Sequence, residues 1–202
     1  MVRYESFHGT VSDIAKNKIK YDKNNIEITN YETEYRVGIA NQRGQRKKPK
    51  SPGSLGYGFY TFVYTKDLAE NFISKSHSDY SIIKVTSEFE EDEILNFDEK
   101  DIREKFHVYR QTFLEYAERI CKQFGNISNN HKQHTFDGLV IENFIKMLEK
   151  KEKKKVSSVL MWTFTPRDEL DEDKRFVSYI PNGLELCVRN LQNIILLEEE
   201  KL

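Results

Sequence analysis

One segment of the chain carries a hydrophobic pattern long enough to fix its secondary structure. Between residues 98 and 124, large apolar side chains recur at steps of three and four, which places them on one side of a helix. This stripe consists of Ile102, Phe106, Tyr109, Phe113, Tyr116, Ile120 and Phe124. We therefore predict one long amphipathic helix, closed by Gly125 and the polar segment that follows it.

The other predicted elements are short. Strands are predicted over residues 4–8, 56–64, 80–85, 136–141, 157–164, 184–189 and 194–197, where aromatic and β-branched residues gather. The first of these is expected to end in a tight turn at Gly9. Shorter helices are predicted over residues 11–18, after residue 67 with Leu68, Ala69, Phe72 and Ile73 at helical spacing, and from Phe144 onward. This mixture predicts a single α+β domain over residues 1–202.

Composition narrows the class of protein. Hydrophobic residues make up 38% of the chain and aromatics 12%, enough for one globular core. The net charge of −1 gives no overall attraction to nucleic acid or to an anionic membrane. Cys121 and Cys187 lack the spacing of a disulfide framework or a zinc ribbon. Residues 1–5 lack the apolar run of a signal peptide, and no segment approaches the roughly 20 apolar residues of a membrane span. A cytoplasmic protein without membrane association is expected.

Three separated segments carry the residues of most chemical interest. The first is Phe7-His8-Gly9-Thr10, at the end of the first predicted strand. The second, residues 56–61, reads Gly-Tyr-Gly-Phe-Tyr-Thr with Tyr60 as its fifth residue, and a predicted helix with Ala69 and Phe72 follows it. The third, residues 185–194, opens with Glu185 at the start of a predicted strand.

Taken in this order, the segments resemble the three motifs of the ADP-ribosyltransferase superfamily, in the branch shared by diphtheria toxin and the poly(ADP-ribose) polymerases. Residues 136–139, Phe-Asp-Gly-Leu, also resemble the aromatic-Asp-Gly strand that often precedes the glutamate motif. The resemblance implies a split antiparallel β-sheet with flanking helices, NAD as the substrate and no metal. His131 and His134 are rejected as metal ligands because no third ligand accompanies them.

The resemblance also implies a role for each motif residue. Glu185 would stabilise the cation-like ribose that forms when the bond to nicotinamide breaks. His8 would hydrogen-bond a ribose, and Gly9 would let the backbone approach the carboxamide closely. Tyr60 would stack on the nicotinamide ring, with Phe72 as a candidate for its other side. Thr10 would assist through its hydroxyl or merely cap the following helix.

Plainer interpretations exist for these residues. Glu185 alone would be read as the outward residue of an alternating strand, and His8 as a histidine beside a turn. Tyr60 and Phe72 would be ordinary core aromatics, which is the favoured interpretation of Tyr64. Cys187 is interpreted as a small packing residue, since no activating group is evident.

Two features bear on the acceptor of ADP-ribose. Arginine-modifying relatives usually carry Glu or Gln two residues before the catalytic Glu, where this chain has Gly183, so arginine is disfavoured. A basic loop precedes the Tyr60 motif and is interpreted either as a contact for phosphate or acceptor or as a solvated loop; its residues are Arg43, Arg46, Lys47 and Lys48. The lysine-rich run 150–155 is interpreted as the exposed end of a helix.

The leading hypothesis is a mono-ADP-ribosyltransferase that acts on a macromolecule, with RNA or DNA favoured over protein. Small members of this kind in microbes and phages are often toxins or antiviral defence effectors, so an antitoxin or inhibitor protein is an expected partner. The alternatives are a protein-modifying transferase, an NAD glycohydrolase, and a non-catalytic module that binds NAD, ADP-ribose or nucleic acid.

Overall fold

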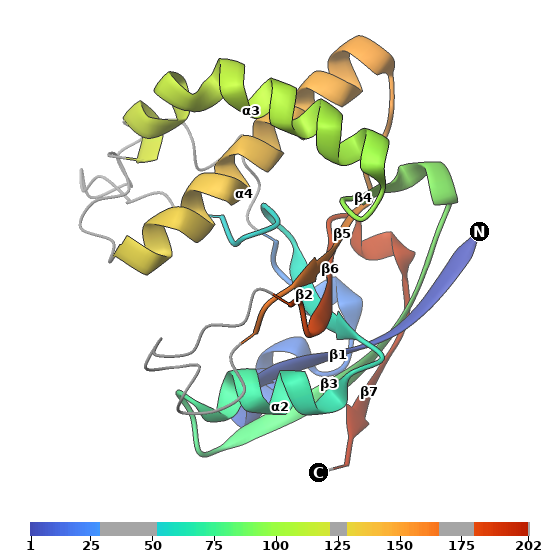
Figure 1. The fold of residues 1–202 in the computed structure, drawn as a ribbon. Helices are drawn as coiled ribbons and strands as arrows, with labels where there is room; N and C mark the ends of the chain where they lie inside the picture. Colours follow the sequence, from blue (N-terminus) through green and yellow to red (C-terminus); the bar gives the residue numbers. More distant parts are fainter. Residues whose placement is uncertain (29–51, 122–128, 166–179, 202) are drawn as a thin grey trace, which may run out of the picture. The chain divides into compact units, whose positions relative to one another are not determined.

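The computed structural model describes residues 1–28, 52–121, 129–165 and 180–201, with the backbone alone described between residues 115 and 135. Contacts divide the chain into two compact units, which we call the sheet unit (residues 1–27, 59–98 and 156–202) and the helical unit (residues 28–58 and 99–155). Figure 1 shows the elements of both units. The prediction of one domain over residues 1–202 stays a prediction.

The sheet unit is built on one seven-stranded sheet. Its order is β4-β5-β6-β2-β1-β3-β7, in which β4 and β5 are parallel and every other pair is antiparallel. The α+β class is therefore confirmed, with a mixed sheet where a fully antiparallel one was expected. The strands are β1 (Val2–Val11), β2 (Phe59–Val63), β3 (Tyr80–Phe89), β4 (Ile94–Asn96), β5 (Ser158–Thr163), β6 (Gly183–Val188) and β7 (Ile194–Glu200).

Strand β1 is longer than predicted. It pairs with β3 over ten residues, from Val2 opposite Phe89 to Val11 opposite Tyr80. The predicted turn at Gly9 is therefore wrong, because the ladder to β3 holds this glycine in extended backbone. The helix predicted over residues 11–18 is a short π-helical turn, η1 (Ile14–Ile19). Single 3-10 turns complete this unit: η2 (Lys23–Asn25), η3 (Glu91–Glu93) and η6 (Leu191–Asn193).

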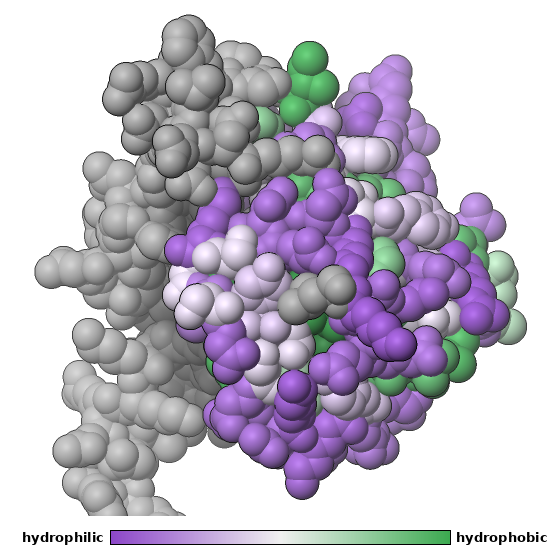
Figure 2. All heavy atoms as spheres, turned by 90° about the horizontal axis from the view of Figure 1, so that it is seen from below, coloured by the Kyte–Doolittle hydropathy of each residue, from purple (hydrophilic) through white to green (hydrophobic). Residues whose placement is uncertain are grey.

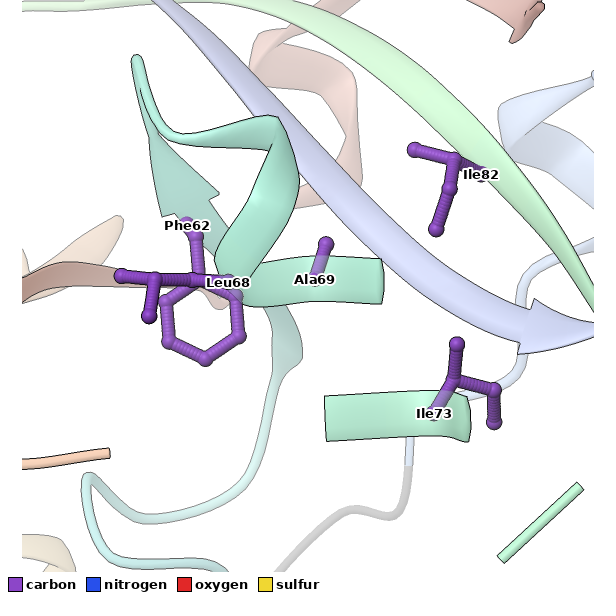
Figure 3. Packing of buried hydrophobic residues seen from close by; sticks show 5 residues of the cluster. All are labelled: Phe62, Leu68, Ala69, Ile73 and Ile82. Atoms are coloured by element: carbon purple, nitrogen blue, oxygen red, sulfur yellow. The ribbon is translucent and has the colours of Figure 1, made fainter. Parts of the chain in front are cut away.

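Helix α2 (Lys66–Ser74) covers the middle of one sheet face. It buries Leu68, Ala69 and Ile73, which lie at the helical spacing predicted for this segment. Figure 3 shows these side chains meeting Phe62 of β2 and Ile82 of β3. Burying each large aliphatic side chain contributes about 1.5–3 kcal/mol, so this contact fixes α2 against β1, β2 and β3.

The helical unit contains α3 (Lys100–Cys121) and α4 (Asn129–Met147), followed by the π-helical turn η5 (Leu148–Glu152). Two residues of the predicted stripe, Phe106 and Tyr109, face the second helix, while the side chains of Tyr116, Ile120 and Phe124 lie outside the described part of the chain. The ring of Phe106 meets that of Phe144 edge-on at 5.5 Å, and the Tyr109 ring lies 5.4 Å from the same Phe144 ring. None of the described helices is both long and apolar enough to span a membrane.

The strand predicted over residues 136–141 is wrong, because these residues lie inside α4. Leu139, Val140, Ile141 and Phe144 are all buried, so the helix is apolar on several sides. An apolar run of this kind shows neither the periodicity of a helix nor the alternation of a strand. Only the apolar residues that follow it at helical spacing, as far as Leu148, distinguish a helix from a strand here. The resemblance of residues 136–139 to an aromatic-Asp-Gly strand therefore fails in this structure.

A short loop packs on α4 through two features of that helix. The Glu142 side chain, 1% exposed, accepts a hydrogen bond from the backbone N–H of Tyr57 at 2.6 Å. One turn earlier, a Cβ built on Gly138 would lie 1.8 Å from the carbonyl oxygen of Gly53. Loop and helix therefore meet backbone to backbone, which only glycine at position 138 allows.

We expect Gly138→Ala to destabilise the protein by about 1–3 kcal/mol, because the Gly53 backbone must move to admit the methyl group. The sign of the change in unfolding free energy is informative, because Gly→Ala inside an ordinary helix stabilises a protein by up to about 1 kcal/mol. Urea unfolding would measure the change, with the exposed α3 substitution Gln111→Ala as a control that stays within about 0.5 kcal/mol. A stabilised Gly138→Ala variant would contradict the packing described here.

Candidate functional site

The three motifs of the sequence meet on neighbouring strands at the centre of the sheet. His8 lies on β1, Tyr60 on β2 and Glu185 on β6, and β2 pairs with both of the other strands. Residues more than 170 positions apart in the chain are thereby brought onto adjacent strands. The predicted strand positions of all three residues are confirmed.

Tyr60 and Glu185 share one face of the sheet. Tyr60 is opposite Cys187, and Glu185 is opposite Phe62, two residues further along β2. Side chains of directly opposite residues point to the same face, as do those of every second residue along a strand. The two are diagonal neighbours, and diagonal neighbours lie within reach of a tyrosine and a glutamate side chain. This is also the face that α2 covers, since Phe62 packs on Leu68.

The carboxylate of Glu185 is held by a neighbouring strand. The Thr163 hydroxyl on β5 donates a hydrogen bond to Oε1 of Glu185 at 2.9 Å. Met161 is directly opposite Glu185 in the β5–β6 ladder, so Thr163 is its diagonal neighbour. Sequence reasoning missed Thr163, because it fixed the strand but not its register against β6.

The ring of His8 lies on the other face of the sheet. His8 follows Phe7, which is opposite Phe62, so alternation turns its side chain away from Tyr60 and Glu185. Its ring lies 4.3 Å from that of Phe59, centroid to centroid. Its Nδ1 is 2.8 Å from the carbonyl oxygen of Tyr60, which can only accept, so Nδ1 carries the hydrogen. His8 therefore bridges β1 and β2 through the Tyr60 backbone.

Burial lowers the pKa of His8 below its ordinary value of 6.5, and the hydrogen bond to the Tyr60 carbonyl opposes this only in part. The ring is therefore neutral at pH 7, with Nδ1 as its donor and Nε2 as an acceptor. Among the described residues, none is seen to bond to Nε2. His8 can thus offer a lone pair to a hydroxyl group, but only on the face of the sheet opposite Tyr60 and Glu185.

Gly9 directs its backbone polar groups toward β2, beyond the last residue pair of the β1–β2 ladder. The Tyr64 N–H donates to the Glu5 carbonyl at 3.0 Å, so the polar groups of Glu5 point toward β2. Those of Gly9 point the same way, because this direction repeats every second residue of an antiparallel strand. The β1–β2 register, however, consists of Ser6 with Val63 and Phe7 with Phe62. Gly9 lies just beyond that short ladder.

A side chain at position 9 would collide with α2. A Cβ there would lie 2.5 Å from the carbonyl oxygen of Ala69 and 2.9 Å from Ile73 Cγ2. The glycine is thus required by helix packing, a reason that the sequence did not reveal. Gly183 lies under the same helix, where an added Cβ would meet Leu68 Cδ1 at 2.6 Å.

The remaining predicted residues have different surroundings. Phe72 is 60% exposed on α2, with its ring 6.3 Å from that of Phe62. Tyr64 is 68% exposed and has a positive φ of 57°, so its interpretation as a core aromatic is wrong. Thr10 is buried inside β1 opposite Ser81, so it does not cap the following helix. The basic residues Arg43, Arg46, Lys47 and Lys48 lie outside the described residues.

Comparisons of this chain with protein-family models, with curated proteins and with solved structures gave no match. Any functional assignment must therefore come from the site itself: a carboxylate and a tyrosine on one face, a neutral histidine on the other, and a glycine backbone beyond the end of a short ladder.

The lowered pKa of His8 predicts a pH dependence of stability. A histidine that binds its proton more weakly when folded favours the unfolded state at acid pH, so stability is complete above pH 6.5 and falls below it. We expect the unfolding free energy to fall between pH 7.5 and pH 5.5, and His8→Asn to reduce that fall. Urea unfolding at several pH values would measure it, with the exposed His77→Asn as the matched control. An equal fall in the protein and in His8→Asn would contradict a buried neutral His8.

Proposed function

We propose that this chain is an ADP-ribosyltransferase that moves ADP-ribose from NAD to a macromolecular acceptor and releases nicotinamide. The observation that carries the proposal is that three distant motifs lie on adjacent strands, β1 with His8 and Gly9, β2 with Tyr60 and β6 with Glu185, and that Tyr60 and Glu185 share one face of the sheet. The resemblance of these segments to the motifs of the superfamily supports the same assignment.

In the proposed reaction the bond between ribose C1′ and the nicotinamide nitrogen breaks. Nicotinamide leaves with the electron pair, and the ribose gains positive charge as the bond lengthens. A carboxylate beside the ribose stabilises this charge more in the transition state than in the ground state. We assign this role to Glu185, whose orientation Thr163 holds. The acceptor nucleophile then bonds to C1′ and loses its proton.

The backbone of Gly9 suits the carboxamide of nicotinamide. A carboxamide offers an N–H donor and a C=O acceptor side by side, and a strand residue offers the complementary pair. Tyr60 supplies an aromatic ring on the face of Glu185, where the pyridinium ring would stack. The His8 ring lies on the other face of the sheet, so in this proposal it acts on the site by holding the Tyr60 backbone through the hydrogen bond from Nδ1 to the Tyr60 carbonyl.

Gly183 argues against an arginine acceptor. An acidic side chain at this position would have to displace Leu68 of α2, because even a Cβ would lie 2.6 Å from Leu68 Cδ1. The chain thus lacks the acidic residue that usually holds a target guanidinium. We favour a nucleic-acid acceptor, with protein and water as the alternatives that the experiment separates.

In the decisive experiment, the purified protein is incubated with a cell lysate and with NAD that carries a radioactive adenylate phosphate. The label is then followed into the nucleic-acid and protein fractions. We expect label in the nuclease-sensitive fraction, release of nicotinamide, and a rate about 100-fold or more lower in Glu185→Gln, since transition-state stabilisation is lost. Glu198→Gln, an exposed glutamate of β7, serves as the control with unchanged rate.

The outcomes separate the candidate functions. Absence of nicotinamide release by the unaltered protein would refute the enzyme. Nicotinamide release without label transfer would identify a glycohydrolase, and protease-sensitive label a protein-modifying transferase. Full activity of Glu185→Gln would refute the site.

Thr163 is a positioning residue in this proposal. We expect Thr163→Val to lower kcat about tenfold, the usual worth of a hydrogen bond to a charged group, with KM for NAD little changed. Thr163→Ser keeps the hydroxyl and should restore most of the rate. Equal losses in the valine and serine variants would show that Thr163 acts through packing alone.

A further inference from the structure

The two units of the chain carry opposite net charge. From the sequence, the sheet unit has 13 basic and 22 acidic residues, a net charge of −9, and the helical unit has 19 basic and 11 acidic residues, a net charge of +8. The signs persist when only the described residues are counted, at −7 and +3. The overall charge of −1 is therefore the sum of two large and opposite charges, one on each unit.

Among the described residues, the cationic character of the helical unit is concentrated at one turn. Residues 146–155 hold six lysines and two glutamates, a net charge of +4. Lys150, Lys151 and Lys153 are exposed there on the turn η5 and its C-cap. Lys153 has a left-handed φ of 57°, and its N–H closes the turn by donating to the Leu148 carbonyl. Among the described residues, no ion pair to these three lysines is seen; Glu152 pairs with Lys105 at 2.5 Å.

We propose that this lysine turn, residues 150–155, is a docking surface for the sugar-phosphate backbone of a nucleic acid. Lysines on a solvated turn bind phosphates by displacing condensed counterions, which requires no base recognition. The net charge of −9 on the sheet unit does not attract the same polyanion, so the electrostatic attraction comes from the helical unit. The surface names the acceptor class of the proposed transferase and in that sense rests on the proposed function.

The lysine turn fits a nucleic acid better than a membrane. A membrane-surface segment pairs its cationic face with exposed apolar side chains that enter the lipid. At this turn the apolar residue Leu148 is 1% exposed and faces the protein interior. Figure 2, which is seen from below the view of Figure 1, shows a face that is mostly hydrophilic, with hydrophobic residues confined to smaller groups.

The chain contains a matched control for the lysine turn. The sheet unit has a second π-helical turn, η1, with exposed Lys16 and Lys18 and a C-cap Lys20 in the same left-handed conformation, φ 54°. Replacing three lysines by glutamine at either turn removes the same formal charge from the same type of backbone; at η1 the change also removes an ion pair of Lys16 with Glu199 at 3.8 Å.

The test measures binding of a fluorescent 20-nucleotide single-stranded RNA by anisotropy at several salt concentrations, without NAD. We expect Lys150→Gln/Lys151→Gln/Lys153→Gln to weaken binding at least about tenfold at 100 mM salt and to lower the salt slope by about 2, since three phosphate contacts are lost. The triple substitution of Lys16, Lys18 and Lys20 should leave both unchanged. If the triple variant does not fold, the double variant Lys150→Gln/Lys151→Gln replaces it, because this variant keeps Lys153 in its left-handed conformation. We expect it to give about two thirds of the effect on the salt slope.

The remaining outcomes would overturn the inference. These are no binding of RNA by the unaltered protein at 50 mM salt, equal loss in the η1 control, and equal affinity for RNA and for poly-glutamate or phosphatidylserine vesicles. Because the assay contains no NAD, it stands or falls separately from the label-transfer experiment: RNA binding without transfer would keep the docking surface and refute the transferase.

Discussion

Unequal pairing of the first strand is the constraint on which the candidate site depends. β1 pairs with β3 along its whole length, from Val2 to Val11, but pairs with β2 only at Ser6 and Phe7. The long ladder on one side keeps Gly9 in extended backbone, while the short ladder on the other ends before that residue. The polar backbone groups of Gly9 are thereby held rigidly beyond the last residue pair of the β1–β2 ladder. A binding group on a fixed strand is positioned more accurately than one on a loop.

Helix α2 places a second demand on the same residues. Its carbonyl at Ala69 lies so close to the sheet that position 9 admits no side chain, and a side chain at position 183 would have to displace Leu68. Packing against α2 thus favours glycine at both positions, and the proposed chemistry depends on the backbone groups that these glycines leave without a side chain. At position 9 a backbone stays accessible to a ligand in the proposal, and at position 183 an acidic residue for arginine is excluded. A single packing contact therefore limits both the substrate and the acceptor of the proposed enzyme.

The long stripe of the first helix was predictable because four or more turns repeat one spacing, and Phe106 and Tyr109 do face α4. The short motifs behaved differently. Residues 136–141 form a helix although they read as a strand, because Val140 and Ile141 are buried on several sides and show no period. β4 spans only Ile94–Asn96, too short a run to be distinguished from a loop by pattern.

The sequence by itself determined the α+β class and the strand positions of His8, Tyr60 and Glu185, because these properties depend on residue type and local spacing. Tertiary structure decided which residues share a face. Register places Tyr60 beside Glu185 and turns the His8 ring to the opposite side, and a shift of one residue would reverse that result. It also supplied Thr163 as the partner of Glu185 and α2 as the reason for Gly9, since contacts between distant segments leave no trace in local spacing.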